Sequence, residues 1–357
     1  MFENHKPLNL TVAADYLALV VRNLGYLPRG SVVVQAVMNN DTVGGVLRVE
    51  LNACLVNPER VHSLVRDAML QTGVTAVTVG VFVDESTPVE PEEAARVVES
   101  VGDELGMFGE LSVVASWYVG KDSVTPLDRD SEPENLDELI TGITTGAVLD
   151  LTRADFLPKA DPVTAFKRTD GPKFHELLES AGTAMPPFSE LLTVWEFALD
   201  TPVERISPAT LAMLAQSLTD SDVRDGVLTL AASNYTMALS TVQDELIREA
   251  LGYEHIIMGT TKAAPEWRKI DALETLLGHM AGQTEHHDRI YSQTLAMMTW
   301  IAWAKGKGTD SNAFSKACQT VDPTNQLPRL IDLLGMCKWA IIREHSWSHY
   351  KDNQITD

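Results

Sequence analysis

Apolar residues follow two different spacings along the first part of the chain, which indicates helices alternating with strands. Thr11–Leu24 has the helical spacing of an amphipathic segment and is followed by Gly25, a typical helix end. Ser31–Met38 and Val43–Leu51 are rich in apolar and β-branched residues, as strands are. Because Asn39-Asn40-Asp41 between them has turn chemistry, we expect a β-hairpin here.

A second strand pattern follows the hairpin. Val74–Val83 is almost entirely β-branched, which is typical of a strand buried on both faces. Pro91 begins a helical segment that ends near Gly106, and Leu111–Val119 returns to strand character. Strand, helix and strand at this spacing predict a right-handed crossover between parallel strands. We therefore predict an α/β domain over residues 1–165, sandwich-like, with a mixed sheet that combines a β-hairpin and a βαβ crossover.

The strand pattern ends at about Ala165, and helix start signals follow one another from there. Ser207-Pro208, Pro265 and Asp310 each stand where a helix is expected to begin. We predict an all-α helical domain over residues 166–357. Its tryptophans are expected to pack helices together, because large aromatics at helical spacing usually do so. Six of the seven tryptophans lie in this half: Trp195, Trp267, Trp300, Trp303, Trp339 and Trp347.

One segment near residues 290–335 resembles a single tetratricopeptide-like helical hairpin. It has small and aromatic residues followed by Ala317 and then Asp322-Pro323. A second copy does not follow 34 residues away, and a lone unit cannot bury its apolar face without neighbours. We therefore expect a hairpin packed inside one domain rather than a repeat array.

The net charge of the chain makes one class of partner, nucleic acids, unfavourable. The 357 residues include 28 basic and 50 acidic ones, a formal net charge of −22, with −14 in residues 1–165 and −8 in residues 166–357. Nucleic-acid affinity depends largely on Lys and Arg neutralising phosphates, so no nucleic-acid partner is predicted. Residues 120–138 hold seven acids against two bases and are expected to form a solvated excursion, a hairpin tip followed by a loop.

Cysteine content and hydropathy indicate a cytoplasmic protein. Cys54, Cys318 and Cys337 are an odd number, lie far apart and form no CxxC pair, so buried thiols in a reducing compartment are expected. The N-terminus has no basic stretch followed by an apolar core, as a signal peptide would. The longest strongly apolar stretch, Leu295–Ala304, is about half of the ~20 residues that a membrane span needs. No membrane association is predicted.

Catalytic motifs with a known mechanism are missing from the sequence. It has no GxxxxGK[ST] phosphate loop, GxGxxG turn, GxSxG elbow or HExxH pair, so no cofactor is predicted and the sequence favours a non-enzyme. The weak catalytic candidates lie in the α/β half. Asp84 and Glu85 follow a strand, where α/β proteins often bind ligands. Arg48 lies inside a strand with Asp15 or Glu50 as a partner, and structural ion pairing is the default interpretation for all of these.

A histidine-rich segment is the weak candidate for a metal site. His279 precedes His286 by seven residues, which places both on one face if the helix continues, and Asp288 follows. A zinc site needs three or four ligands held by further partners, whereas Gly282 interrupts this segment. Acids and histidines at a junction between helices more often cap and solvate it. His345 and His349, four residues apart, have the same ordinary interpretation near a helix end.

Five blocks in order along the chain resemble the sequence signature of one family. They are Leu24–Val34, Arg48–Leu51, Gly146 with Thr152-Arg153, Ser221–Asp225, and Trp300–Gly308 with Ala317–Pro323. The family is the domain of unknown function 4192 family, which is uncharacterised and widespread in actinobacteria, and the resemblance covers about residues 8–335. This chain resembles a divergent, phage-borne or mobile-element member, because an acid-rich proline motif is missing after Leu51 and the Ala317–Pro323 step is one residue longer. The family supplies no functional residue to carry over.

Two functions remain open at this stage. The favoured hypothesis is a non-enzymatic binding or assembly protein that acts through protein–protein contacts, with a protein partner or self-association, because catalytic motifs are missing and the second half is rich in helices and tryptophan. The alternative is a hydrolase-like enzyme for a small-molecule ligand, with a site at the carboxyl edge of the N-terminal sheet or at the domain junction. A metal-binding role for His279, His286 and Asp288 is a third hypothesis.

Overall fold

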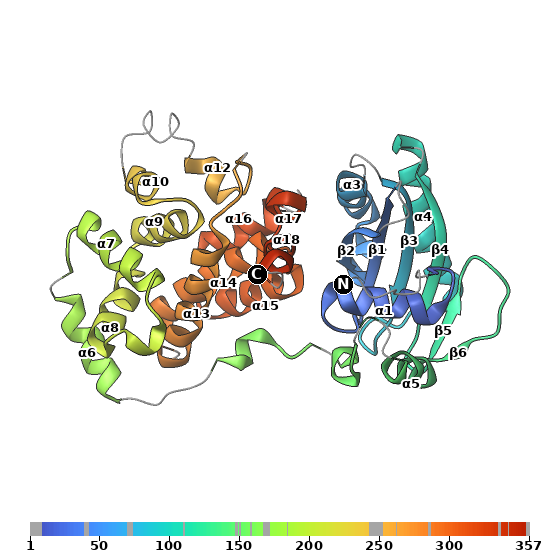
Figure 1. The fold of residues 1–357 in the computed structure, drawn as a ribbon, viewed down its shortest axis with the longest axis horizontal. Coiled ribbons are helices and arrows are strands. Elements are labelled where there is room, and N and C mark those ends of the chain that lie inside the picture. Colours follow the sequence, from blue (N-terminus) through green and yellow to red (C-terminus); the bar gives the residue numbers. More distant parts are fainter. Residues whose placement is uncertain are drawn as a thin grey trace. The chain divides into compact units, whose positions relative to one another are not determined.

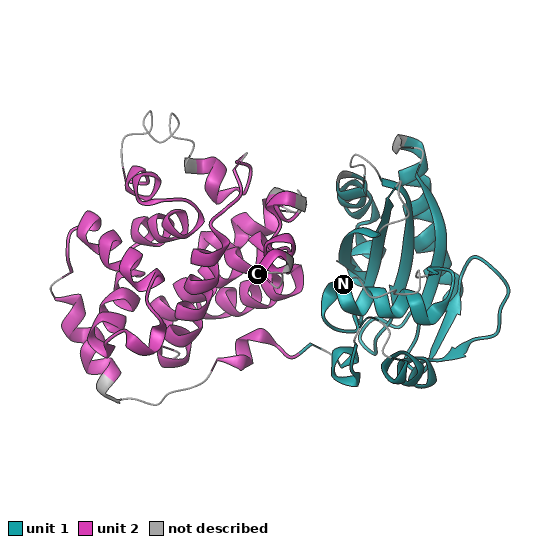
Figure 2. Ribbon diagram, in the orientation of Figure 1, with its two compact units in different colours: residues 1–159 teal, residues 160–357 magenta. Residues whose placement is uncertain are grey.

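A computed structural model of the chain forms two compact units, Met1–Lys159 (unit 1) and Ala160–Asp357 (unit 2), which are described separately (Figure 2). The predicted boundary at residue 165 and the tetratricopeptide-like character of residues 290–335 stay predictions. The structure describes residues 9–38, 43–69, 74–109, 111–146, 149, 151–157, 159–166, 172–183, 185–242, 253–261, 263–284, 287–334, 337–341 and 343–354.

Unit 1 is built on a mixed six-stranded sheet with the strand order β2-β1-β3-β4-β5-β6 (Figure 1). β1 pairs antiparallel with both β2 and β3, β3 pairs parallel with β4, and the β5 pairings are antiparallel. The hairpin and the βαβ crossover predicted from the sequence are thus confirmed, although the hairpin turn lies outside the described residues. The strands are β1 (Ser31–Met38), β2 (Val43–Glu50), β3 (Val74–Phe82), β4 (Ser112–Val119), β5 (Ser123–Pro126) and β6 (Glu134–Asn135).

Helices cover both faces of this sheet (Figure 1). α1 and α5 share one apolar cluster with alternate strand residues such as Val33 and Phe82. α3 and α4 contact each other and strands β2, β3 and β4. The neighbouring strand residues Val32 and Val81 are also buried but belong to the other face, because side chains alternate along a strand. The helices are α1 (Ala13–Leu24), α2 (Leu51–Val56), α3 (Pro58–Met69), α4 (Pro91–Gly109), α5 (Leu136–Thr145) and the short 3-10 turn η2 (Arg153–Phe156).

A close contact between Tyr16 and Gly80 fixes the position of α1 on the sheet. Tyr16 is completely buried and stacks on Phe82 and Trp117, with ring centroids 6.4 and 5.8 Å apart. A Cβ atom at Gly80 would lie 2.0 Å from the Tyr16 hydroxyl oxygen, so only glycine leaves room for this ring. The strand glycine is therefore a packing requirement rather than a flexible point.

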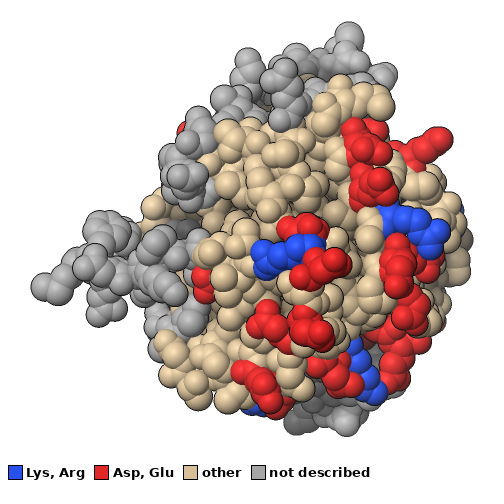
Figure 3. All heavy atoms as spheres, turned by 90° about the vertical axis from the view of Figure 1, so that its right-hand side faces the viewer, with Lys and Arg blue, Asp and Glu red and all other residues tan. Residues whose placement is uncertain are grey.

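Acidic side chains gather on the surface of unit 1. Figure 3 shows a face on which Asp and Glu clearly outnumber Lys and Arg. All seven acids in residues 120–138 are exposed, as the sequence predicts for that segment. The two bases there have partners within the unit: Lys121 pairs with Glu85, and Arg129 donates to the Thr11 carbonyl while lying over the Trp117 ring. The acids therefore dominate the field around this surface.

Unit 2 is helical, and its described residues contain no strand, which confirms the predicted change from sheet to helices. α14 lies at its centre and packs on α13, α15 and α16. Its stretch Leu295–Ala304 is buried along its whole length. The helices are α6 (Pro172–Gly182), α7 (Phe188–Leu199), α8 (Pro208–Ser217), α9 (Ser221–Ala232), α10 (Tyr235–Ser240), α12 (Tyr253–Ile257), α13 (Trp267–Thr284), α14 (Asp288–Ala304), α15 (Gly308–Val321), α16 (Gln326–Leu334), α17 (Lys338–Ile341) and α18 (Trp347–Gln354), with 3-10 turns η3 (Pro162–Ala165), η4 (Val203–Arg205) and η5 (Arg343–His345).

Among the helices that the structure describes, none combines the length and the apolar character that crossing a bilayer requires.

A buried cation holds the C-terminal helix in place. The side chain of Lys305 is fully buried and pairs with Asp271 at 2.6 Å and with Glu274. From α18, Lys351 pairs with Asp271 at 2.9 Å, and the Trp347 indole donates to the same carboxylate at 2.9 Å. Burial favours the neutral form of Asp271, but the hydrogen bonds from Lys305 and Lys351 outweigh it and lower the pKa of this carboxyl.

Replacing the strand glycine should destabilise unit 1. Gly80→Ala forces a methyl group against the Tyr16 ring, and overpacking of this kind costs about 1–3 kcal/mol or more. The free energy of unfolding from denaturant titration measures the effect. Gly45→Ala is the matched control, because nothing lies within 4 Å of a Cβ at that strand position. Equal stability of the two variants would show that the Tyr16 contact does not constrain the fold.

Removing the Asp271 charge should destabilise unit 2 in a pH-dependent way. Since the pKa of Asp271 is lowered in the folded chain, its ionic contacts stabilise the fold above about pH 3.9, the unfolded value, and this stabilisation is lost as the pH falls through the folded pKa. Asp271→Asn should cost about 1–3 kcal/mol at neutral pH, and the difference from wild type should shrink in acid.

The control for this prediction is Asp200→Asn. Asp200 pairs with Arg268 at 2.7 Å, but both side chains are about half exposed, so the loss should stay below about 1 kcal/mol. Urea unfolding at several pH values measures both variants. A pH-independent effect of Asp271→Asn would contradict the ionic explanation.

Candidate functional site

The carboxyl edge of the sheet brings two of the sequence-predicted residues together. Gly30, with a φ of 52°, directly precedes β1 beside the end of β3, and a Cβ there would lie 2.4 Å from the Asp84 Oδ2 atom. The Asp84 Oδ1 atom accepts from the Ser86 amide and hydroxyl and from the Thr87 amide at 2.8–3.0 Å. Arg48 donates to the Arg29 carbonyl at 3.4 Å. Asp84 and Arg48 thus contact the same turn at residues 29–30.

The charges at this edge largely compensate one another. Arg29 donates to the Gly120 carbonyl at 3.2 Å. Burial lowers the pKa of Arg29, while the Asp84 and Asp122 carboxylates oppose that shift. An arginine flanked by two carboxylates attracts an anion weakly. The arrangement fastens the start of β1 to the ends of β3 and β4.

The other two catalytic candidates lie apart from this turn. Glu85 is exposed and pairs with Lys121 at 3.2 Å, with both side chains more than three-quarters exposed. Asp15 lies in the first turn of α1 and accepts from the Asn9 amide at 2.7 Å. A catalytic role for Asp84, Glu85, Arg48 and Asp15 stays a prediction.

The histidine-rich segment forms a different arrangement from the one predicted. His279 lies on α13, Asp288 begins α14, and His286 lies outside the described residues. Within the described part of the chain, no three or more His, Cys, Asp or Glu side chains are grouped as a metal site requires. The His287 Nε2 atom instead lies 3.1 Å from the Nδ1 atom of His175 on α6, with the two rings stacked. Sequence reasoning missed His175, because no local pattern links residues 112 positions apart.

A small cavity of about 200 Å³ lies between α2, α3 and α4 of unit 1. In it the Ser100 hydroxyl and the His62 Nε2 atom are 2.8 Å apart, which resembles a nucleophile beside a base. Ser100 lies in the middle of α4, however, where backbone amides donate within the helix and cannot stabilise an oxyanion. Together with the ion pair of Arg66 and Glu104 at 3.0 Å, this contact ties α3 to α4.

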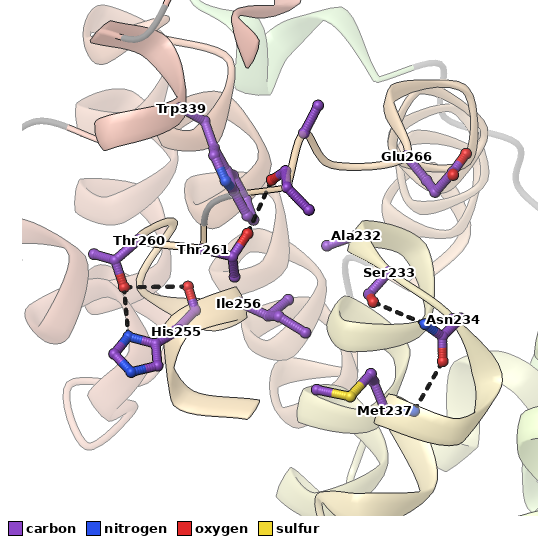
Figure 4. A pocket seen from close by; sticks show the side chains of 12 residues that line it. Ala232, Ser233, Asn234, Met237, His255, Ile256, Thr260, Thr261, Glu266 and Trp339 are labelled. Carbon is purple, nitrogen blue, oxygen red and sulfur yellow. Dashed lines mark hydrogen bonds between the residues drawn. The ribbon is translucent and has the colours of Figure 1, made fainter. Parts of the chain in front are cut away.

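The larger cavity, of about 650 Å³, lies in unit 2 among the ends of α9, α10, α12 and α17 and the segment before α13 (Figure 4). Its volume is within the range of small-molecule and cofactor sites. The described residues that line it are Ala232, Ser233, Asn234, Met237, His255, Ile256, Thr260, Thr261, Ala263, Ala264, Glu266 and Trp339.

Most polar side chains of this pocket form hydrogen bonds within the loops that carry them (Figure 4). Asn234 donates to the Ser233 hydroxyl at 3.2 Å and caps α10 by accepting from the Met237 amide. The His255 Nδ1 atom contacts the Thr260 hydroxyl at 2.9 Å. The Thr261 hydroxyl donates to the Ala263 carbonyl at 2.9 Å. The pocket wall is thus shaped by these local bonds.

Trp339 forms one wall of the pocket and is packed edge-on between two other indoles. Its ring centroid lies 6.1 Å from that of Trp300 and 6.3 Å from that of Trp267, both in T-shaped contacts. Gly259, with a φ of 60°, makes room for it, because a Cβ there would lie 2.7 Å from the Cys337 sulfur and 3.5 Å from the Trp339 Cε3 atom. Cε3 is on the edge of the ring opposite Nε1, so the edge that bears the N–H faces away from Gly259.

The Trp339 N–H has no acceptor among the described residues, although the residue is only 1% exposed. The two neighbouring indoles are satisfied. Trp267 donates to the His345 carbonyl at 2.8 Å, and Trp300 donates to the Ile257 carbonyl at 2.8 Å. A buried donor usually has an acceptor, so the Trp339 N–H is an exception among the described residues, and its Nε1 atom has almost no solvent-accessible surface.

The comparisons with known proteins gave a family match within unit 1. A family model described as Domain of unknown function (DUF4192) matches residues 14–125, which run from α1 to β5. No curated protein and no solved structure matched the chain. The resemblance to this family is supported for that stretch, while the blocks at Ser221–Asp225 and Trp300–Gly308 and the actinobacterial or phage-borne origin stay predictions. The large pocket lies outside the matched residues.

The cysteines beside the two cavities should be unreactive. Burial raises the pKa of Cys54 to about 12 and that of Cys337 to about 11, so both thiols are protonated at neutral pH. Alkylation by iodoacetamide in the native protein should be slower than in urea by on the order of a hundredfold, as peptide mass spectrometry measures. Equal rates in the two conditions would contradict both the burial and the raised pKa values.

Proposed function

We propose that the protein is a non-enzymatic binding protein, and that its helical unit receives the partner in the large pocket at Trp339. The observation that carries this proposal is an open cavity of about 650 Å³ whose wall combines the Trp339 ring with polar and apolar side chains from several helix ends.

The wall chemistry supports binding rather than catalysis. Ser233, Thr260 and Thr261 bond to neighbouring side chains or carbonyls and so stabilise the loops that shape the pocket. The lining combines these groups with apolar side chains such as Ile256 and Met237, a mixture that is typical of ligand sites.

A cytoplasmic location belongs to this proposal. Cys54, Cys318 and Cys337 are free and buried, which suits a reducing compartment.

The alternative of a hydrolase-like enzyme at the carboxyl edge of the sheet has one observation in its favour. Arg48 and Asp84 contact the same turn at residues 29–30. The Asp84 Oδ1 atom already accepts three hydrogen bonds from Ser86 and Thr87, which favours a structural role. Hydrolysis of a panel of p-nitrophenyl esters that Arg48→Gln abolishes without a loss of stability would support the enzyme instead.

Site-specific crosslinking tests the binding proposal. A photoreactive p-benzoylphenylalanine in place of Ala264, at the pocket rim, should give a defined adduct with host extract. The same group in place of Ala209, exposed in the first turn of α8, is the matched control. Intact mass spectrometry distinguishes a protein adduct from a small-molecule adduct. Equal adduct yields at the two positions would refute the pocket as a binding site.

A further inference from the structure

Unit 1 has an apolar groove beside an exposed apolar side chain. The groove is the cavity of about 200 Å³ between α2, α3 and α4, and Val61 and Val101 in its wall are buried. Val56, at the end of α2, follows the lining residue Leu55 and is 75% exposed. A projecting apolar residue therefore adjoins an apolar depression, whereas exposed apolar residues on a soluble chain usually stand alone.

The size of the groove favours a protein side chain over a metabolite. Small-molecule sites usually enclose about 300–1,000 Å³, which is more than this groove offers. Protein–protein interfaces instead have small pockets that single anchoring side chains of the partner fill. The lining suits an apolar anchor, because the Ser100 hydroxyl and the His62 Nε2 atom, 2.8 Å apart, bond to each other. Covering polar groups that are already paired costs less than covering unpaired ones.

Two charged side chains make the groove complementary to a second copy of itself. Glu93 and Arg96 both line it, are exposed and lie within one turn of α4. Neither side chain forms an ion pair with another residue in the described part of the chain. A two-fold axis that sets α4 antiparallel to its counterpart places each Glu93 opposite the Arg96 of the second copy. The same contact then occurs twice, as a closed dimer requires.

The other charges nearby oppose self-association only weakly. Glu59 and Arg60, which follow the lining residue Pro58, add one charge of each sign. Glu92 and Glu99 are exposed on α4 outside the groove, so its margin is acidic. At physiological ionic strength the Debye length is about 8 Å, which screens repulsion between such exposed acids. The formal net charge of −22 acts over a longer range and is screened in the same way.

We propose that the chain forms a two-fold symmetric dimer with a second copy of itself through the groove between α2, α3 and α4. Val56 of each copy fills the groove of the other, and Glu93 of each copy pairs with Arg96 of the other. The contact lies in unit 1 and does not depend on the pocket of unit 2. The inference therefore adds self-association to the proposed binding function and does not rest on it.

Sedimentation equilibrium of the full-length chain tests the apolar contact. The wild type should be a reversible dimer, and Val56→Asp should weaken it at least about thirtyfold, as the loss of an interface anchor does. Leu333→Asp on α16 of unit 2 is the matched control, because Leu333 is 77% exposed, and it should leave the dimer constant unchanged. The denaturation midpoint of each variant, measured alongside, checks that these exposed substitutions leave the fold intact.

Charge reversal tests the two-fold geometry. Glu93→Arg alone and Arg96→Glu alone each set like charges opposite each other in a homodimer, so each should weaken it about tenfold or more. In an equimolar mixture the two variants should form a heterodimer about as tight as the wild type, because each contact between positions 93 and 96 then joins opposite charges. The double variant with both reversals should dimerise for the same reason.

Each other outcome overturns a stated part of the inference. A chain that stays monomeric up to about 100 µM, above the micromolar limit of standard-size interfaces, refutes the dimer. A dimer that Val56→Asp leaves intact uses another surface, which also refutes the proposal. If the two charge variants do not restore each other, the pairing of Glu93 with Arg96 is wrong. None of these results depends on crosslinking at position 264, so the binding function is judged separately.

Discussion

The packing of three indole rings determines how the C-terminal segment of unit 2 lies against α13 and α14. Trp339 lies edge-on between Trp267 and Trp300, so one contact joins α13, α14 and the C-terminal segment. The N–H groups of the two neighbours donate to carbonyls of η5 and α12, which fixes these short elements around the ring. Aromatic pairs in this geometry contribute about 0.5–1.5 kcal/mol each beyond the area they bury.

The same cluster explains why the C-terminal segment stays in place. Lys305 is buried at the end of α14, and its charge is balanced by Asp271 and Glu274 on α13. Trp347 and Lys351 on α18 contact the same carboxylate at Asp271. A buried ammonium is costly without such partners, so the ion cluster and the C-terminal helix depend on each other. α18, which follows Trp339 along the chain, is thus attached to α13 through Asp271.

Unit 1 has an equivalent constraint of its own. The ring of Tyr16 occupies the space above Gly80, and the turn at Gly30 lies against Asp84. Because these two positions lack a side chain, α1 packs closely on β3, and the turn before β1 lies against the end of β3. The carboxyl ends of β3 and β4 therefore lie beside the turn at residue 29. The residues matched by the family model contain both glycines. The fold of this unit and the arrangement of its charged edge therefore come from the same close contacts.

The local pattern of residue types was enough to predict the main strands and helices. β-branched runs at Ser31–Met38 and Val74–Val83 form strands, and the spacing after Ala165 yields helices, because strand and helix periods are properties of neighbouring residues. The edge location of Asp84 also followed from the end of a strand, whereas Arg48 was expected inside a strand. The sequence could not reveal the pairing of His287 with His175, since the contact joins α6 to α14.

The sequence by itself determined the order of sheet and helices, the acidic charge and the burial of most tryptophans, since these depend on local spacing and composition. Only the tertiary structure decided that Trp267 and Trp300 have acceptors while Trp339 has none among the described residues. An acceptor is a backbone carbonyl supplied by a distant segment, and no spacing in the sequence indicates which indole meets one. The candidate site is therefore a consequence of packing rather than of a motif.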